Sequence, residues 1–235
     1  MFNYLSNLFK RNKYDDNLEE ILEYIPKDIF HQIDTDNYDE NNSLFISIKK
    51  FCKKHNEKSS FIVSLSGGVD SMVLISIIKY LGYYVIALHI NYNNRKETTK
   101  EQRFIETWCA YANIQLYVKE ITHIKRNECK QRGLYESITK EIRFKFYNEV
   151  LKKERLNSIL LAHHKDDIVE NVFANVCRSR FILDLAVIRE INTINDIIIC
   201  RPMIKHYKKD IYDFAHKYDI PYFKDTTPDW CVRGK

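Results

Sequence analysis

Residues 61–71 read Phe-Ile-Val-Ser-Leu-Ser-Gly-Gly-Val-Asp-Ser, an apolar, β-branched run that ends in a Ser-Gly-Gly-x-Asp-Ser turn. A helical pattern of apolar residues follows at once, from Met72 to Ile78. This order predicts a buried strand that turns tightly into the N-terminus of a helix. Such a junction directs backbone N–H groups and the positive end of the helix dipole at one point. The sequence therefore predicts an anion-binding loop at residues 66–71.

The residue types in this loop suit a phosphate ligand. Gly67 and Gly68 allow a sharp turn and let a ligand approach the backbone closely. Ser66 and Ser71 supply hydroxyl groups, and Asp70 supplies a carboxylate that can bind Mg²⁺ or cap the helix. The loop is not a Walker A motif, because no Gly-Lys-Ser/Thr follows at the required spacing. The alternative is an ordinary strand–turn–helix junction with a capping aspartate.

Length and composition limit the class of protein. The 235 residues suffice for one large α/β domain with appendages. No apolar run reaches the roughly 18 residues that span a bilayer, and the N-terminus has no secretory signal, so we expect a cytoplasmic protein. None of the six cysteines forms a CxxC pair, which argues against a zinc ribbon or a thioredoxin-like site. The net charge of +5 permits RNA binding.

Strand and helix patterns alternate from about residue 58 onward. Apolar strands separated by helices predict an α/β fold with a doubly wound parallel sheet of about five strands. We expect strands at 61–66, 84–90, 115–121, 158–163 and 197–200, and helices at 71–81, 98–112, 134–154, 166–180 and 208–218. Residues 1–57 predict an N-terminal helical extension, with a helix around residues 18–25 and another capped by Ser43. The expected division is thus 1–57 and 58–235.

A second polar cluster occupies residues 162–170, Ala-His-His-Lys-Asp-Asp-Ile-Val-Glu, after the strand expected at 158–163. Asp166 or Asp167 can cap the next helix, and Glu170 lies one turn further along on the same side. Ligands of parallel α/β sheets bind beyond the carboxyl ends of the strands, where this cluster, the loop and His89 should meet. The carboxylates can bind Mg²⁺ or an ammonium group. A transition-metal site and a capped helix with solvated charges are the alternatives.

Together the two motifs resemble the PP-loop family of N-type ATP pyrophosphatases, and within it the tRNA(Ile)-lysidine synthetases and tRNA 2-thiocytidine synthetases. The resemblance covers about residues 58–235 and extends to the segments at 87–92, 135–144, 201–203 and 218–227. Four positions depart from the family pattern: Tyr92 stands for His, Lys140 for Arg, Phe144 for Tyr and Asn171 for Thr. The family normally continues into helical C-terminal domains beyond the point where this chain stops.

The resemblance implies an adenine nucleotide alpha hydrolase-like fold and an ATP-dependent ligase. Such an enzyme adenylates the C2 position of a tRNA cytidine, releases pyrophosphate, and lets free lysine attack to form lysidine. Its partners are the anticodon loop of tRNA and lysine, with no membrane, and a homodimer is compatible with it. By resemblance, the catalytic residues are Asp70, Asp167, Glu170 and Arg143. ATP is bound by Ser66, Gly67, Gly68, Val69, Asp70, Ser71 and His89, and Mg²⁺ by Asp70 and Asp167.

Other functions stay open at this point. Thiolation of tRNA by a related PP-loop enzyme is one, since Cys177 follows the second cluster, although the chain lacks the CxxC pairs typical of those enzymes. Adenylation of a small metabolite by an amidotransferase-type pyrophosphatase is another, but those enzymes lack the Ala-His-His-x-Asp-Asp signature. A non-catalytic nucleotide- or RNA-binding module is the third, and it would bind ATP without releasing pyrophosphate.

Overall fold

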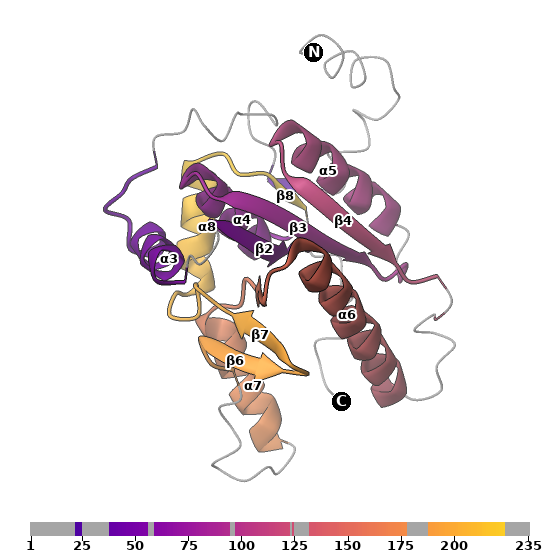
Figure 1. Ribbon diagram of the computed structural model, residues 1–235. Helices are drawn as coiled ribbons and strands as arrows, with labels where there is room; N and C mark the ends of the chain where they lie inside the picture. The colour runs from indigo at the N-terminus through magenta and orange to yellow at the C-terminus, as the bar shows by residue number, and fades with distance from the viewer. Residues whose placement is uncertain are drawn as a thin grey trace.

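The computed structural model describes residues 22–24, 38–55, 59–94, 97–122, 124, 132–177 and 188–223. The helices are α3 (Ser43–Lys54), α4 (Val69–Tyr80), α5 (Thr98–Tyr111), α6 (Arg132–Glu154), α7 (Lys165–Cys177) and α8 (Lys208–Lys217). The strands are β1 (Leu22–Tyr24), β2 (Ser60–Ser64), β3 (Tyr84–Asn91), β4 (Gln115–Glu120), β5 (Ser158–Leu160), β6 (Ile191–Ile194), β7 (Ile197–Cys200) and β8 (Tyr222–Phe223) (Figure 1). The expected helix before residue 22 and the segment after residue 223 lie outside this range.

The main sheet has the strand order β4-β3-β2-β5-β7-β6. Every neighbouring pair is parallel except β6 with β7. Helices α3, α4, α5 and α8 share a core with one face of the sheet, and α6 packs on the other face. Along β2, Phe61 and Val63 belong to the first core and Ile62 to the second, because successive side chains point to opposite faces. The predicted doubly wound fold with five parallel strands is confirmed.

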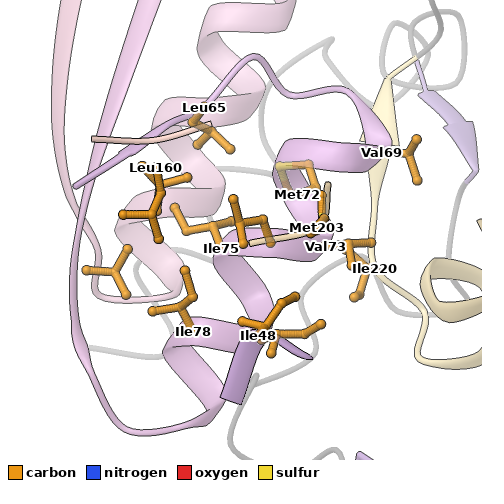
Figure 2. Packing of buried hydrophobic residues seen from close by; sticks show 14 of the residues in the cluster. Ile48, Leu65, Val69, Met72, Val73, Ile75, Ile78, Leu160, Met203 and Ile220 are labelled. Atoms are coloured by element: carbon orange, nitrogen blue, oxygen red, sulfur yellow. The ribbon is translucent and has the colours of Figure 1, made fainter. Parts of the chain in front are cut away.

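Helix α4 is the centre of the larger core. Its residues from Ser71 to Ile78 are all buried, as expected for a helix that is apolar on every side. Figure 2 shows Met72, Ile75 and Ile78 of α4 within the same packed cluster as Leu160. This packing fixes the start of α4, and therefore the loop before it, against the sheet.

The N-terminal part differs from the prediction in two places. Residues 22–24 form β1, which pairs antiparallel with β8, so the helix expected around residues 18–25 is wrong there. Helical spacing of apolar residues carries no information about a pairing partner some 200 positions away. Helix α3 is present, but Asn42 caps it in place of Ser43, because Asn42 Oδ1 accepts the N–H groups of Leu44 and Phe45 at 3.0 and 3.2 Å.

The strand order reverses between β2 and β5. The chain passes from β2 to β3 on one side, whereas β5 pairs with β2 on the other, through Ile62 with Ile159 and Val63 with Leu160. Loops that follow two such strands leave the sheet in opposite directions and open a crevice at their carboxyl ends. The loop after β2 and the cluster after β5 therefore flank the same crevice.

Gly67 is held against β8. Its φ is +87°, in the left-handed region that favours glycine, and its carbonyl accepts the N–H of Phe223 at 3.3 Å. A Cβ on Gly67 would lie 1.8 Å from Cε1 of the Phe223 ring. At Gly68 the nearest atom to such a Cβ is Ser66 Oγ, at an ordinary 3.6 Å. The two glycines thus have different structural requirements.

We expect Gly67→Ala to lower the free energy of unfolding by about 2 to 5 kcal/mol, since it combines a left-handed backbone with a clash against an aromatic ring. Gly68→Ala should cost less than about 1 kcal/mol, the difference between two residues at a helix N-cap. Urea denaturation of both variants measures this difference. Equal stabilities would contradict the packing of Phe223 on Gly67.

Candidate active site

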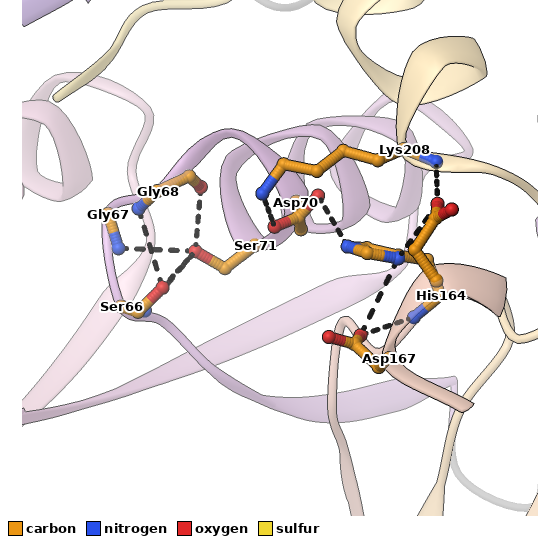
Figure 3. Close-up of polar contacts among 9 residues, drawn as sticks. Ser66, Gly67, Gly68, Asp70, Ser71, His164, Asp167 and Lys208 are labelled. Atoms are coloured by element: carbon orange, nitrogen blue, oxygen red, sulfur yellow. Dashed lines mark hydrogen bonds and ion pairs between the residues drawn. The ribbon is translucent and has the colours of Figure 1, made fainter. Parts of the chain in front are cut away.

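The Ser71 hydroxyl organises the loop at residues 66–71 (Figure 3). Its Oγ accepts the N–H groups of Ser66 and Gly67 at 3.2 and 3.1 Å and donates to the carbonyl of Gly68 at 3.0 Å. Ser66 Oγ lies 3.0 Å from Ser71 Oγ. Ser71 is buried, so this network keeps the loop closed around one hydroxyl group. Two of the amides expected to face a phosphate are therefore already bound to Ser71.

The first turn of α4 supplies the remaining amides. Gly68 is its N-cap and has no side chain, so no side-chain oxygen caps the N–H groups of Val69, Asp70 and Ser71. A helix N-terminus without a cap leaves these donors for water or a ligand. Because the helix dipole adds positive potential at the same place, this end of α4 suits an anion.

Asp70 lies between the two halves of the crevice (Figure 3). Its Oδ1 is 3.5 Å from His164 Nε2, and its Oδ2 is 3.6 Å from Lys208 Nζ. Burial raises the pKa of the Asp70 carboxyl above its usual range, although Lys208 and His164 act in the opposite direction. Ionisation of Asp70 in the site therefore costs free energy, and the contacts with Lys208 and His164 offset only part of that cost.

The cluster after β5 is arranged around His164. Asp167 Oδ2 accepts the backbone N–H of His164 at 2.8 Å, and Asp166 Oδ2 accepts that of Lys208 at 2.7 Å. The His164 ring lies between Asp70 on one side and Asp166 and Asp167 on the other, 3.5 and 3.7 Å from its Nδ1. These contacts connect the starts of α4, α7 and α8 at one point.

The structure offers one oxygen that suits Mg²⁺. Asp70 Oδ1 is buried and has no hydrogen-bond donor, which is costly for a carboxylate oxygen unless a cation binds it. Mg²⁺ in proteins usually takes one or two carboxylates and completes its shell with substrate phosphates and water. Among the described residues no group of three His, Cys, Asp or Glu side chains could hold a metal alone. Asp70 therefore fits a metal ion that arrives with phosphates.

The other expected site residues occupy different places. His89 is buried under the loop, where its Nδ1–H donates to the carbonyl of Leu65 at 2.9 Å, and burial lowers its pKa. Burial raises the pKa of Tyr92 and lowers that of His163, and the charge of Arg143 on α6 acts to lower both. Arg143 Nε is buried without an acceptor. Glu170 is exposed on α7, one turn after Asp167. Direct contact of these three with substrates stays a prediction.

Lys208 was absent from the expected site residues. It is the first residue of α8, and the sequence patterns marked that position only as a helix start. Burial works against its ammonium group, but Asp70 outweighs it and the pKa of Lys208 is raised, so this side chain is a cation facing the loop. No local pattern pointed to Lys208, because its contact with Asp70 joins residues that are far apart in the chain.

We expect Asp70→Asn to raise the Tm at pH 7 in the absence of ligands and metal. The folded pKa of Asp70 is raised above its unfolded value of about 3.9, so the folded state binds the proton of this carboxyl more tightly than the unfolded state does. The protonated carboxyl therefore stabilises the fold below the unfolded pKa, and this stabilisation is lost as the pH rises through the folded pKa. The difference in Tm should close as the pH falls toward 4. Calorimetry with EDTA measures it, with Asp213→Asn on the exposed side of α8 as the control. A Tm equal to or below wild type at pH 7 would contradict the account.

Comparison with known proteins places these features in a family. Residues 41–229 match the family model described as the PP-loop domain. A tRNA(Ile)-lysidine synthase from Mesoplasma florum is 30% identical over 175 residues, which cover 74% of this chain and 43% of that protein. A tRNA(Ile)-lysidine synthase from Francisella tularensis subsp. holarctica is 30% identical over 178 residues, which cover 76% of this chain and 42% of that protein. This chain thus spans less than half the length of these relatives.

The solved structures agree on the fold. The U34-tRNA thiolase NcsA from Methanococcus maripaludis superposes with a TM-score of 0.61 at 20% identity, over 78% of this chain and 66% of that one. A PAPS reductase from Candida auris superposes with a TM-score of 0.51 at 11% identity, over 77% of this chain and 82% of that one. The family match spans both the loop after β2 and the cluster after β5, and it shows that this chain belongs to the PP-loop family.

Proposed function

We propose that this protein is an ATP-dependent ligase that forms lysidine in tRNA. The observation that carries the proposal is the meeting of the loop and the acidic cluster, with Asp70 and His164 3.5 Å apart. A phosphate site and a cation-binding carboxylate site in one crevice suit a reaction that first activates a substrate with ATP and then adds an amine. The curated relatives named tRNA(Ile)-lysidine synthase support this choice.

The first half of the proposed reaction takes place on the loop. The amides at the start of α4 bind the phosphates of ATP, and Lys208, 3.6 Å from Asp70 Oδ2, neutralises part of their charge. Asp70 would hold Mg²⁺, which supplies Lewis-acid stabilisation of the leaving pyrophosphate when it is bound. A cytidine O2 atom attacks the α-phosphorus, so that an O–P bond forms and the bond to pyrophosphate breaks.

The second half takes place at the cluster. Free lysine approaches the adenylated C2 position, its amine forms the new C–N bond, and the C2–O bond breaks with loss of AMP. The amine must lose a proton to attack, and we assign Asp167 and Glu170 to bind and deprotonate it. Asp167 is partly buried beside His164, which suits a carboxylate that binds an ammonium group.

The proposal extends to partners and location. The anticodon loop of a tRNA presents an unstacked cytidine, which a site in a crevice can reach. The net charge of +5 favours binding of RNA, so the affinity should fall as salt rises. None of the described helices has the length and apolarity needed to span a bilayer. We place the reaction in the cytoplasm with tRNA, and sedimentation velocity would test a homodimer.

Thiolation of tRNA is the second candidate. The fold likeness to the thiolase NcsA, and the exposed Cys177 at the end of α7, are the observations in its favour. Cys52, Cys109 and Cys200 are buried, and burial raises the pKa of the first two thiols to about 12. Such thiols are poor nucleophiles, so among these four described cysteines Cys177 is the one that suits sulfur transfer.

Labelled lysine separates these candidates. We expect radioactive lysine to enter tRNA when ATP and Mg²⁺ are present, and pyrophosphate to be released in equal amount. Asp70→Asn should abolish both, while Cys177→Ser should change neither. Release of pyrophosphate without lysine incorporation, lost in Cys177→Ser, would favour thiolation. Binding of ATP with no release would favour a non-catalytic module.

We expect Lys208→Ala to raise the KM for ATP by about 10- to 100-fold, the effect of losing one hydrogen bond to a charged group. Lys209→Ala removes the same charge from the exposed neighbouring position and should leave the KM unchanged. Steady-state measurement of pyrophosphate release at varied ATP gives both values. An equal effect of the two substitutions would show that Lys208 acts only through overall charge.

A further inference from the structure

The buried Arg201 and the partly buried His163 form a pair beside the cluster. Arg201 Nε–H donates to Nδ1 of His163 at 2.9 Å. Arg201 is itself fixed, because its Nη1 donates to the carbonyl of Arg189 at 2.9 Å and to Asn192 Oδ1. Asn192 belongs to β6, so the antiparallel hairpin at the edge of the sheet orients this guanidinium. Arg201 is 4% exposed, which leaves it little freedom to turn away.

This contact determines where the proton of His163 lies. A guanidinium has only donors, so the ring nitrogen that faces it must offer a lone pair. Nδ1 of His163 is therefore unprotonated, and the neutral ring carries its proton on Nε2. A proton on Nδ1 would set two N–H groups against each other. Neither Arg201 nor the described part of the chain provides an acceptor for Nε2–H.

The tautomer limits what His163 can do in catalysis. A neutral imidazole with its proton on Nε2 donates a hydrogen bond from that atom and cannot remove a proton with it. His163 is thus unsuited to deprotonate the attacking amine, and an Nε2–H cannot bind an ammonium group. Both tasks therefore stay with the carboxylates of Asp167 and Glu170, to which the proposed reaction assigns them.

We propose that Arg201 is a positioning residue that fixes the Nε2–H tautomer of His163, and that His163 donates this hydrogen bond to an anionic oxygen of a substrate. The carboxylate of Asp167 acts on the ring as well as the guanidinium groups of Arg201 and Arg143. The acceptor oxygen is therefore required by the Nε2–H donor itself and not by the net charge around the ring. The proposed reaction offers two such oxygens, on the α-phosphate of ATP and on the carboxylate of lysine. The second part of the inference rests on the proposed function, whereas the tautomer does not.

Nitrogen-15 NMR of histidine-labelled protein tests the tautomer without any substrate. We expect the His163 signals, identified by their loss in His163→Gln, to show an unprotonated Nδ1 and a protonated Nε2 at neutral pH. Arg201→Met should let the second tautomer or the imidazolium appear, and Arg201→Lys, which keeps a donor, should restore the first. A protonated Nδ1 in the wild-type protein would overturn the inference, even if the Arg201 variants fail to fold.

Paired substitutions of His163 test the donor role. Glutamine keeps an N–H donor near the position of Nε2 but is not a base, so His163→Gln should retain activity within about 10-fold of wild type. His163→Met removes the donor and should lose about 10²- to 10³-fold, as for other donors to developing charge. His55→Gln, far from the crevice at the end of α3, controls for the substitution itself.

The affected step identifies the acceptor. If His163→Met slows pyrophosphate release measured without lysine, the acceptor is the α-phosphate. If it raises only the KM for lysine, the acceptor is the lysine carboxylate. Equal loss of activity in His163→Gln and His163→Met would contradict a donor role. Failure of every variant and of wild type to modify tRNA, with the Nε2–H tautomer present, would count against the proposed function and not against the tautomer.

Discussion

The parallel pairing of β2 with β5 is the constraint on which the rest of the site depends. It sets the carboxyl ends of two strands side by side, although about 95 residues separate them in the chain. Each strand leads into a helix, so the N-termini of α4 and α7 open into one crevice. The start of α8 joins them, because Lys208 donates its backbone N–H to Asp166. Three helix starts thus bring phosphate-binding amides, carboxylates and a lysine within reach of one another.

Polar groups in this crevice are left poorly satisfied, which suits a site that binds charged substrates. Asp70 Oδ1, His164 Nδ1 and Arg143 Nε are buried without hydrogen-bond partners. Each such atom costs free energy in the folded protein, and the packing of α4 and the sheet compensates for that cost. Substrates that supply a cation beside Asp70, or an anion beside Arg143, would recover part of it. Stability and activity therefore oppose each other at Asp70.

Much of this arrangement could be predicted from sequence, because it depends on local patterns. The apolar run at 61–64 and the glycines after it predicted β2 and the loop, and the doubly wound fold followed from alternating strands and helices. Strand β6 was missed, although Asn195 and Asp196, both with positive φ, form the turn that pairs it with β7. The pairing of β1 with β8, and the contacts of Lys208 and Arg201, depend on residues distant in sequence. No local periodicity encodes those contacts.

The source of an oxygen atom in AMP tests the central claim most directly. In the proposed reaction the cytidine O2 attacks the α-phosphorus and leaves with AMP, so water contributes no oxygen. Mass spectrometry of AMP formed in ¹⁸O-labelled water, with tRNA, lysine, ATP and Mg²⁺ present, should therefore show no ¹⁸O. AMP that contains ¹⁸O would mean that water, and not tRNA, attacks ATP in this crevice, and would contradict the account.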